Sequence, residues 1–320
     1  MFLEDHAAWT LRRPGRTALC TAIAVAFAAA CTTAASQTTD RAPVSVFAYD
    51  RSASLDVREA SRAERDGFVF IDLTYLSPKG GRVPAYLWVP LDPGPHPGLV
   101  LMHGLPGTRD GMVRLGDRYA RAGAVAIAIT APFARTEAGL QRPVSFTSAD
   151  RGQQVQLIVD LQRAVDVLVA REDVDPSRLG YVGVSYGGAM GGLLAGVERR
   201  ITAYALVVGD GGLVAHFSGP DDRGGWLDTM PASQRDAWLA AMQPIEPIRF
   251  VGDAAPARLL FQNARADRLV PAADAERYQA AGSEPKELRW YDGGHGVSPE
   301  MLRDQAAWFA KVIGLRAESR

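Results

Sequence analysis

The fold is decided by one stretch of the sequence, Leu179-Gly180-Tyr181-Val182-Gly183-Val184-Ser185-Tyr186-Gly187-Gly188-Ala189-Met190. Its first half is apolar and predicts a buried strand, whereas its second half consists of small residues that predict the start of a helix. Gly183 and Gly187 flank Ser185 at the spacing of a Gly-x-Ser-x-Gly nucleophile elbow, in which a strained strand-to-helix turn raises a serine hydroxyl above a sheet. Glycine is required on both sides because a Cβ there would press on the neighbouring strand or on the incoming helix.

The elbow has a simpler alternative, since small residues also gather where a helix packs closely on a strand. In favour of the elbow, a helix that begins at Tyr186 directs its unpaired N–H groups and the positive end of its dipole toward the serine oxygen. Negative charge develops there in acyl transfer. The rest of the chain separates the two interpretations, because a catalytic serine needs an acid and then a histidine later in the sequence.

Two later segments supply these residue types in the required order. Asp267 follows the strand predicted over Arg258 to Gln262, and His295 lies between glycines after the strand predicted over Glu287 to Tyr291. Since the carboxyl ends of parallel strands meet at one edge of a sheet, both side chains are expected beside Ser185. His295 would take the Ser185 proton through Nε2, and Asp267 would accept the hydrogen bond from Nδ1–H.

Both partners also have a structural interpretation. Asp267 could cap the helix entered at Pro271, and His295 could belong to a glycine-rich turn. Asp210 and Asp292 are rival acids. Asp210 follows an earlier strand, and Asp292 is too close to His295 in sequence to orient its ring easily, so Asp267 is the preferred acid.

An oxyanion hole needs two N–H donors beside the nucleophile. The backbone N–H of Tyr186, the residue after the serine, is the first. The second is expected in the loop after the apolar run that ends at Met102, with Leu105 N–H as first choice and Gly104 N–H as second. His103 is interpreted as a structural residue that holds this loop, because His295 already follows the last strand.

The order of the remaining elements is that of an α/β fold. A hairpin opens the sheet, and strands then alternate with helices in βαβ order, which predicts a mostly parallel, doubly wound sheet. The predicted strands are Phe68 to Tyr75, Val83 to Val89, Gly98 to Met102, Ala124 to Thr130, Leu179 to Val184, Ala203 to Val208, Arg258 to Gln262 and Glu287 to Tyr291. The predicted helices are Met112 to Ala122, Gln153 to Val169, the segment after Ser185, Ala273 to Ala281 and Pro299 to Ile313.

The chain is expected to divide into a leader (residues 1–36), a linker and N-terminal extension (residues 37–66) and a catalytic domain (residues 67–315). Leu55 to Asp66 is charged and is expected to cover an edge of the domain. Residues 210–255 interrupt the alternation with one short helical pattern and are predicted to form a small cap insertion. Its aromatic, Met and Pro residues could line an acyl pocket or pack a satellite core, and packing is favoured for any single one. They are Trp226, Met230, Pro231, Trp238, Met242, Pro244 and Pro247.

The composition is that of a globular chain. With 320 residues, of which 47% are hydrophobic and 22% charged, the sequence can bury a large core in one or two domains. Thirty-five basic and 36 acidic side chains give a formal charge of -1. This balance excludes the strong positive field that attracts nucleic acid or an anionic membrane surface.

The N-terminal segment resembles a signal peptide. Three arginines precede an uncharged run from Thr17 to Ala30, which is too short to cross a bilayer comfortably as a helix of about 20 residues. Export is therefore expected, to the periplasm, the cell envelope or the medium. The small residues before Cys31 permit simple cleavage and release, and they also resemble a lipoprotein site at which lipid on Cys31 would attach the protein to a membrane.

Metal and cysteine chemistry find no support in the sequence. Cys20 and Cys31 are the only cysteines, so the mature chain is expected to lack a disulfide, a catalytic thiol and thiolate metal ligands. His96 and His216 have no partner pattern, and no zinc site is predicted. Neither a cofactor nor a metal ion is expected.

These residues together resemble the α/β-hydrolase superfamily, in particular the catalytic domains of dienelactone-hydrolase-like and prolyl-oligopeptidase-type proteins. The resemblance covers Asp66 to Leu315. It rests on His103-Gly104, the Ser185 elbow, the Asp267 segment that ends in Val270-Pro271, and His295 between glycines. A serine at the elbow departs from the branches that use aspartate there and from dienelactone hydrolases proper, which use cysteine. The chain also has no room for the β-propeller of the oligopeptidases.

The resemblance implies hydrolysis of an ester, thioester or amide through an acyl-enzyme on Ser185 without a cofactor. A carboxylesterase acting on a small-molecule ester is expected. An exported peptidase or amidase is the enzymatic alternative, and a non-catalytic envelope binding lipoprotein is the alternative from another class. The sequence does not predict the acyl or alcohol specificity or the oligomeric state.

Overall fold

The computed structural model describes residues 41–218 and 227–316. The predicted leader, Cys31 and Trp226 lie outside the described residues. Within these two ranges, no helix has the length and the apolar character that crossing a membrane requires.

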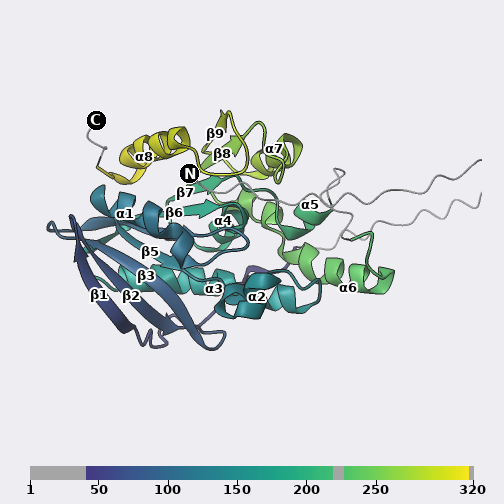
Figure 1. The fold of residues 1–320 in the computed structure, drawn as a ribbon, viewed down its shortest axis with the longest axis horizontal. Coiled ribbons are helices and arrows are strands. Elements are labelled where there is room, and N and C mark those ends of the chain that lie inside the picture. The colour runs from purple at the N-terminus through teal and green to yellow at the C-terminus, as the bar shows by residue number, and fades with distance from the viewer. Residues whose placement is uncertain (1–40, 219–226, 317–320) are drawn as a thin grey trace, which may run out of the picture. The chain divides into compact units, whose positions relative to one another are not determined.

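The described chain forms a nine-stranded sheet with the order β1-β2-β3-β5-β4-β6-β7-β8-β9 (Figure 1). The first two pairs and the β3–β5 pair are antiparallel, and all pairs from β5–β4 to β8–β9 are parallel. The strands are β1 (Arg58–Arg65), β2 (Phe68–Leu76), β3 (Arg82–Pro90), β4 (His96–Met102), β5 (Val125–Ile129), β6 (Val174–Val184), β7 (Ala203–Val207), β8 (Arg258–Ala264) and β9 (Lys286–Tyr291). The predicted mostly parallel sheet with an antiparallel opening hairpin is confirmed.

Helices cover both faces of this sheet. They are α1 (Val113–Arg121), α2 (Glu137–Gln141), α3 (Ala149–Val169), α4 (Tyr186–Val197), α5 (Leu213–Phe217), α6 (Ala232–Met242), α7 (Ala272–Ala281) and α8 (Pro299–Ile313). Short 3-10 turns lie at η1 (Val44–Phe47), η2 (Arg109–Met112), η3 (Pro132–Arg135), η4 (Gln243–Ile245), η5 (Pro247–Arg249) and η6 (Val251–Asp253).

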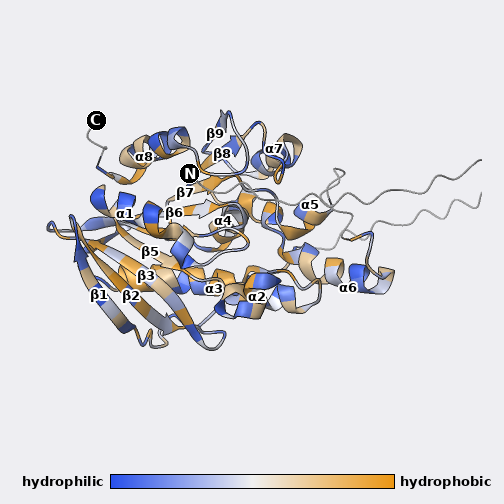
Figure 2. Cartoon of the chain, in the orientation of Figure 1, coloured by the Kyte–Doolittle hydropathy of each residue, from blue (hydrophilic) through white to orange (hydrophobic). Residues whose placement is uncertain are grey.

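Each face of the sheet has its own apolar core, and a different set of helices covers each core. Alternate side chains of one strand point to opposite faces, so Tyr181 of β6 joins the core under α3, α4 and α7, while Val182 joins the core under α1 and α8. In Figure 1, α1 and α8 lie on one side of β5 and β6 and α3 on the other. Figure 2 shows hydrophobic colour along β3 and β5 and mixed colour on the outer helices. This arrangement is the doubly wound fold that the βαβ order predicts.

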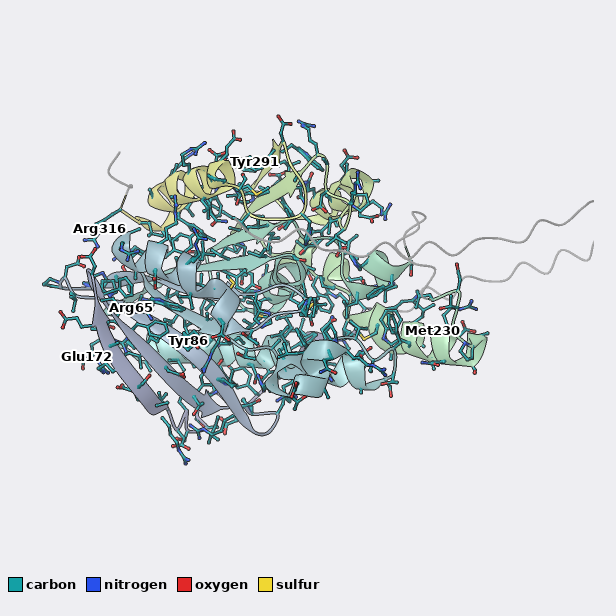
Figure 3. All side chains as sticks on the ribbon, in the orientation of Figure 1. Arg65, Tyr86, Glu172, Met230, Tyr291 and Arg316 are labelled. Carbon is teal, nitrogen blue, oxygen red and sulfur yellow. The ribbon has the colours of Figure 1, made fainter. Side chains whose placement is uncertain are left out.

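The edge strand β1 is the main element that the sequence did not predict. The charged segment before Asp66 was expected to cover an edge, and it forms the edge itself by pairing antiparallel with β2. Seven of its eight residues are exposed, so it lacks the alternation of apolar and polar residues that identifies a half-buried strand. Arg65 ties β1 to α1 through a 3.1 Å hydrogen bond to Asp117, and its guanidinium lies over the ring of Phe70. Figure 3 labels Arg65 and Tyr86 at this end of the sheet.

The buried large residues of the insertion pack, as favoured, but into the main core under α3 and α4 rather than into a satellite core. Trp238 and Met242 of α6 are fully buried, and Trp238 Nε1 donates a 2.8 Å hydrogen bond to Asp150 at the start of α3. The insertion contains α5 in addition to the one helix that was predicted. Five residues are too few to show helical periodicity in a sequence, which explains why α5 was missed.

Candidate active site

The turn at Ser185 has the geometry of a nucleophile elbow. Ser185 joins β6 to α4 with φ 56 and ψ -117, a backbone region that is unfavourable for a residue with a side chain. A Cβ on Gly183 would collide with the carbonyl of Gly187, and a Cβ on Gly187 would collide with the carbonyl of Met102 in β4. Both glycines are therefore needed for the close approach of helix and strand, for the reason expected from the sequence.

The structure brings Ser185, His295 and Asp267 together from three separate loops. His295 Nε2 lies 2.8 Å from Ser185 Oγ, and His295 Nδ1 lies 2.8 Å from Asp267 Oδ2. Each residue follows the carboxyl end of its strand, namely β6, β8 and β9, which converge at one edge of the sheet. Asp267 Oδ1 accepts hydrogen bonds from the N–H groups of Leu269 and Val270, both at 2.9 Å, so both carboxylate oxygens are held.

These hydrogen bonds also set the charge of Asp267. Burial alone raises the pKa of its carboxyl, but the hydrogen bond from His295 and two backbone N–H groups outweigh burial, and the pKa lies below its usual value. The carboxylate is therefore ionised at neutral pH and accepts the Nδ1–H of His295. In this tautomer Nε2 carries the lone pair that accepts the Ser185 hydroxyl proton.

The loop after β4 reaches the serine. A Cβ on Gly104 would lie 3.1 Å from Ser185 Cβ and 3.6 Å from Ser185 Oγ, so the backbone of this loop passes directly beside the hydroxyl. Leu105 lines the same pocket as Ser185. Tyr186 is the first residue of α4, and its N–H has no partner within the helix. All three predicted oxyanion residues thus lie around Ser185, and their role as donors stays a prediction.

His103 has the structural role expected for it. Its ring is 2% exposed, its Nε2 accepts a 3.1 Å hydrogen bond from Ala131 N–H, and its Nδ1–H therefore donates to the carbonyl of Gly104 at 2.8 Å. Burial lowers the pKa of His103 from 6.5 to about 4 and keeps the ring neutral. Because C=O and N–H point opposite ways across a trans peptide, fixing the Gly104 carbonyl also fixes the direction of Leu105 N–H.

The rival acids do not reach His295. Asp292 is exposed, and the described partners of the His295 ring nitrogens are Asp267 and Ser185, while Asp210 Oδ2 lies 2.8 Å from His216 Nδ1. His216 thus has a hydrogen-bond partner that no sequence pattern indicated. His96 also has one, the carbonyl of Asp92 at 2.9 Å. The Asp210–His216 pair was missed because its histidine lies on α5, a helix that the sequence did not reveal.

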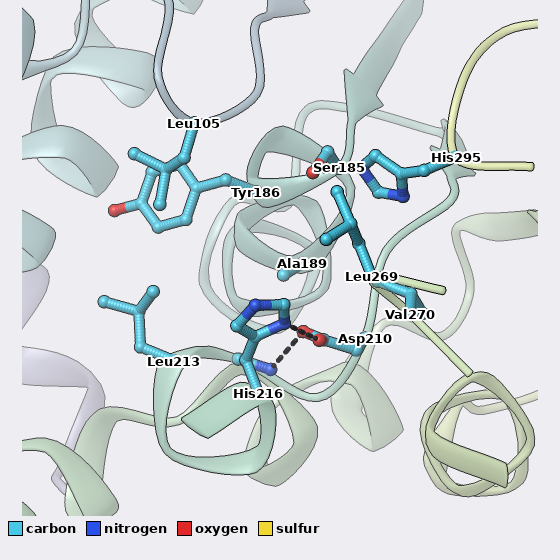
Figure 4. A pocket seen from close by; sticks show the side chains of 11 residues that line it. Leu105, Ser185, Tyr186, Ala189, Asp210, Leu213, His216, Leu269, Val270 and His295 are labelled. Carbon is cyan, nitrogen blue, oxygen red and sulfur yellow. Dashed lines mark hydrogen bonds and ion pairs between the residues drawn. The ribbon is translucent and has the colours of Figure 1, made fainter. Parts of the chain in front are cut away.

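A small pocket of about 90 Å³ lies directly over Ser185 (Figure 4). Ser185 and His295 line one side of it, and the Asp210–His216 pair lines the other. Its apolar lining comes from Leu105, Tyr186, Ala189, Leu213, Leu269 and Val270. Leu105 and His216 also line a neighbouring cavity of about 760 Å³, whose other walls include Arg142, Ser145, Phe146 and Phe217. Among the described residues, no group of three or more His, Cys, Asp or Glu side chains could hold a metal ion.

Comparison with known proteins identifies the family. Residues 146–316, just over half of the 320, match the model of the prolyl oligopeptidase family. The chain belongs to this family. No curated protein matches the chain. The match covers the elbow, the Asp267 segment and His295, on which the resemblance to prolyl-oligopeptidase-type domains rested, and leaves His103-Gly104 outside.

Solved structures share the fold of this prolyl oligopeptidase family member. An acetyl xylan esterase from Paenibacillus sp. R4 has a TM-score of 0.65 and 22% identity, over 81% of this chain and 90% of that one. Acetyl xylan esterase 1 from Thermoanaerobacterium sp. JW/SL YS485 has a TM-score of 0.63 and 15% identity, over 83% and 91%. A glucuronoyl esterase from Solibacter usitatus has a TM-score of 0.59 and 17% identity, over 83% and 87%. At these identities the likeness shows the fold, which is the α/β-hydrolase fold expected from the sequence.

Proposed function

We propose that this protein is a serine hydrolase that cleaves carboxylic esters through an acyl-enzyme intermediate. The observation that carries the proposal is the unbroken chain of two 2.8 Å hydrogen bonds from Ser185 through His295 to Asp267. A hydroxyl, an imidazole and a buried carboxylate in this order form a nucleophile, its general base and the group that orients the base.

In the first half of the reaction, Ser185 Oγ attacks the acyl carbon while His295 Nε2 accepts the hydroxyl proton. The oxyanion that forms lies between the N–H groups of Tyr186 and Leu105, with the Gly104 backbone alongside. The imidazolium is stabilised by the Asp267 carboxylate. It then gives its proton to the leaving alcohol, and the carbon–oxygen bond to the alcohol breaks.

In the second half, water replaces the alcohol. His295 Nε2 takes a proton from this water, the hydroxide oxygen attacks the acyl carbon, and the same N–H groups hold the second oxyanion. Collapse of this intermediate returns the proton to Ser185 Oγ and releases the carboxylic acid. The cycle needs no group beyond the side chains and backbone of the chain and one water molecule.

The pocket favours a short acyl group. Its volume of about 90 Å³ equals about three water molecules, which suits an acyl group of a few heavy atoms. Two similar structures are named acetyl xylan esterases, and an acetyl group is of this size. We therefore expect kcat/KM for p-nitrophenyl acetate to exceed that for p-nitrophenyl octanoate.

The Ser185→Ala variant tests the proposed function. It should keep its far-UV circular dichroism and its unfolding midpoint and lose essentially all turnover of p-nitrophenyl acetate, because only the hydroxyl is removed. Turnover by the folded variant above about a thousandth of the wild-type rate would refute the assignment of Ser185 as nucleophile.

A peptidase is the second candidate, and the family match favours it specifically, since the family model is named for prolyl oligopeptidases. Amide cleavage uses the same side chains, so the geometry of the relay does not separate the two. Comparing an aminoacyl-p-nitroanilide with the matching p-nitrophenyl ester does. A kcat/KM for the anilide equal to or above that for the ester would replace esterase by peptidase. If neither compound is turned over by folded wild-type protein, the non-catalytic binding protein becomes the better candidate.

Export and membrane attachment are part of the proposal and rest on residues 1–36. A signal peptide would direct the chain to the periplasm or beyond, and lipid on Cys31 would anchor it in the envelope. Expression in a bacterial host of wild-type protein and Cys31→Ser separates the two alternatives. A lipoprotein partitions into the membrane fraction only when Cys31 is present, whereas a released enzyme is soluble in both cases.

A further inference from the structure

The pocket over Ser185 holds a second imidazole that the proposed reaction does not use. His216 of α5 lies across the pocket from His295, with its ring below Ala189 in Figure 4. Its Nδ1 lies 2.8 Å from Asp210 Oδ2, and Asp210 Oδ1 accepts a 3.1 Å hydrogen bond from Gly212 N–H. Asp210 is 5% exposed, so this carboxylate faces the ring and the backbone rather than solvent.

The ring of His216 is fixed from several sides. Phe217 meets it edge-on, with centroids 5.0 Å apart and planes at 90°, and Phe217 in turn packs against Phe146 at 4.9 Å. The helix itself is held by the buried Glu246, whose side chain accepts hydrogen bonds from two N–H groups of α5 at 3.0 and 3.1 Å. A side chain locked by packing and by supporting hydrogen bonds is what a binding site needs in order to recognise one geometry.

This fixed ring presents one unused nitrogen. Because Nδ1–H donates to Asp210, Nε2 of the neutral ring carries a lone pair and is a hydrogen-bond acceptor. Among the described residues, Nε2 has no hydrogen-bond partner, and the His216 side chain is 29% exposed. His216 lines both the small pocket and the larger cavity beside it. A substrate that extends from Ser185 toward the larger cavity passes this acceptor.

The chemistry at Ser185 decides which part of the substrate meets His216. The leaving alcohol must lie within reach of His295 Nε2, which protonates it, and the carbonyl oxygen must lie at the N–H groups of Tyr186 and Leu105. The remaining substituent is the acyl chain, and the part of the pocket across from Ser185 and His295 carries the Asp210–His216 pair (Figure 4). The other residues that line the rest of the pocket are Ala189, Gly212, Leu213, Leu269 and Val270. The acyl chain therefore extends toward the acceptor nitrogen.

We propose that His216 Nε2 accepts a hydrogen bond from a hydroxyl group on the acyl chain, which makes the substrates esters of short hydroxy acids. This inference rests on the proposed esterase function and assigns His216 as a specificity-determining residue, with Asp210 as the residue that positions it. A neutral donor fits better than an ammonium group, because Asp210 is the one carboxylate among the described lining residues and both of its oxygens already accept hydrogen bonds.

Pairs of esters that differ only by hydroxyl against methyl test the inference. Methyl lactate is compared with methyl isobutyrate, and methyl 3-hydroxybutanoate with methyl 3-methylbutanoate, by acid release at pH 8. In wild-type protein, the ratio of kcat/KM for the hydroxyl member to that for its methyl partner should, in at least one pair, exceed their ratio in hydroxide-catalysed hydrolysis about tenfold, the effect of one hydrogen bond of about 1.4 kcal/mol.

Two variants test whether His216 causes the preference for the hydroxyl ester. His216→Leu removes the acceptor, and the hydroxyl-to-methyl ratio should fall to the ratio of the two esters in hydroxide-catalysed hydrolysis. His216→Gln places an amide oxygen near the position of Nε2 and should retain part of the preference. Ratios in wild-type protein no higher than those of hydroxide-catalysed hydrolysis in both pairs, or an unchanged ratio in folded His216→Leu, would overturn this inference and leave the esterase proposal standing. Wild-type protein that hydrolyses no ester of either pair and no p-nitrophenyl ester would overturn both.

Discussion

The buried ring of His103 should make the free energy of unfolding depend on pH. Its ring is buried under the loop that carries Gly104 and Leu105, with Nδ1–H bonded to a carbonyl and Nε2 bonded to an N–H group. Nδ1 already carries a proton, and Nε2 cannot take one up without breaking the bond from Ala131 N–H. Burial lowers the pKa of His103 from 6.5 to about 4. The perturbation that tests this is His103→Asn, in which the amide nitrogen can still donate to the Gly104 carbonyl but nothing titrates.

The sign and size of this pH effect follow from the difference in the pKa of His103 between the folded and the unfolded chain. As the pH falls below 6.5, the histidine of the unfolded chain binds a proton and that of the folded chain does not, so the free energy of unfolding decreases until about pH 4. The full effect is about 3 kcal/mol, and about 2 kcal/mol of it falls between pH 7 and pH 4.5.

The assay is equilibrium unfolding in urea at pH 7 and at pH 4.5 for wild-type protein and His103→Asn. All other titrating groups are common to the two proteins, so the difference between their pH dependences isolates His103. The variant should be less stable at pH 7, because it lacks the bond to Ala131 N–H, and it should lose about 2 kcal/mol less than wild-type protein on acidification. Parallel losses in the two proteins would refute the neutral, buried ring.

Two further predictions concern the relay and the elbow. Asp267→Asn should lower kcat by about four orders of magnitude with the fold retained, because an amide no longer selects the tautomer of His295 that accepts the serine proton. The esterase assay at pH 8 measures this loss, and a loss of less than tenfold would contradict the role of Asp267. Gly187→Ala should lower the free energy of unfolding in urea by about 3 kcal/mol or more, because the added Cβ would collide with the Met102 carbonyl. Gly152→Ala in α3 is the control. Its added Cβ meets nothing within 4 Å, so the variant should be as stable as wild-type protein or more stable by up to about 1 kcal/mol.

The relay could be located from the sequence because topology brings its members together. Ser185, Asp267 and His295 each follow an apolar run that reads as a strand, and parallel strands place their carboxyl ends at one edge whatever their order in the sheet. The glycines at positions 183 and 187 were informative for a related reason. Their spacing reflects two backbone collisions that the structure shows directly.

The second imidazole could not be found in this way. The contact between His216 and Asp210 depends on how α5 leaves the end of β7, and a five-residue helix has no periodic signal. The edge strand β1 was missed for another reason, since both of its faces are mostly charged or polar and its sequence shows no alternation of apolar and polar residues. Both misses concern segments whose conformation is set by tertiary contacts rather than by the local pattern.

Whether His295 activates Ser185 is tested most directly by labelling the whole, folded protein with a fluorophosphonate probe, followed by mass spectrometry of its peptides. Such a probe reacts with a serine hydroxyl only where a neighbouring base activates it and N–H groups hold the developing negative charge. We predict one adduct on Ser185 in wild-type protein and none at that position in His295→Ala. Absence of an adduct in folded wild-type protein, or an adduct that persists undiminished on Ser185 after His295 is removed, would contradict a serine activated by this histidine.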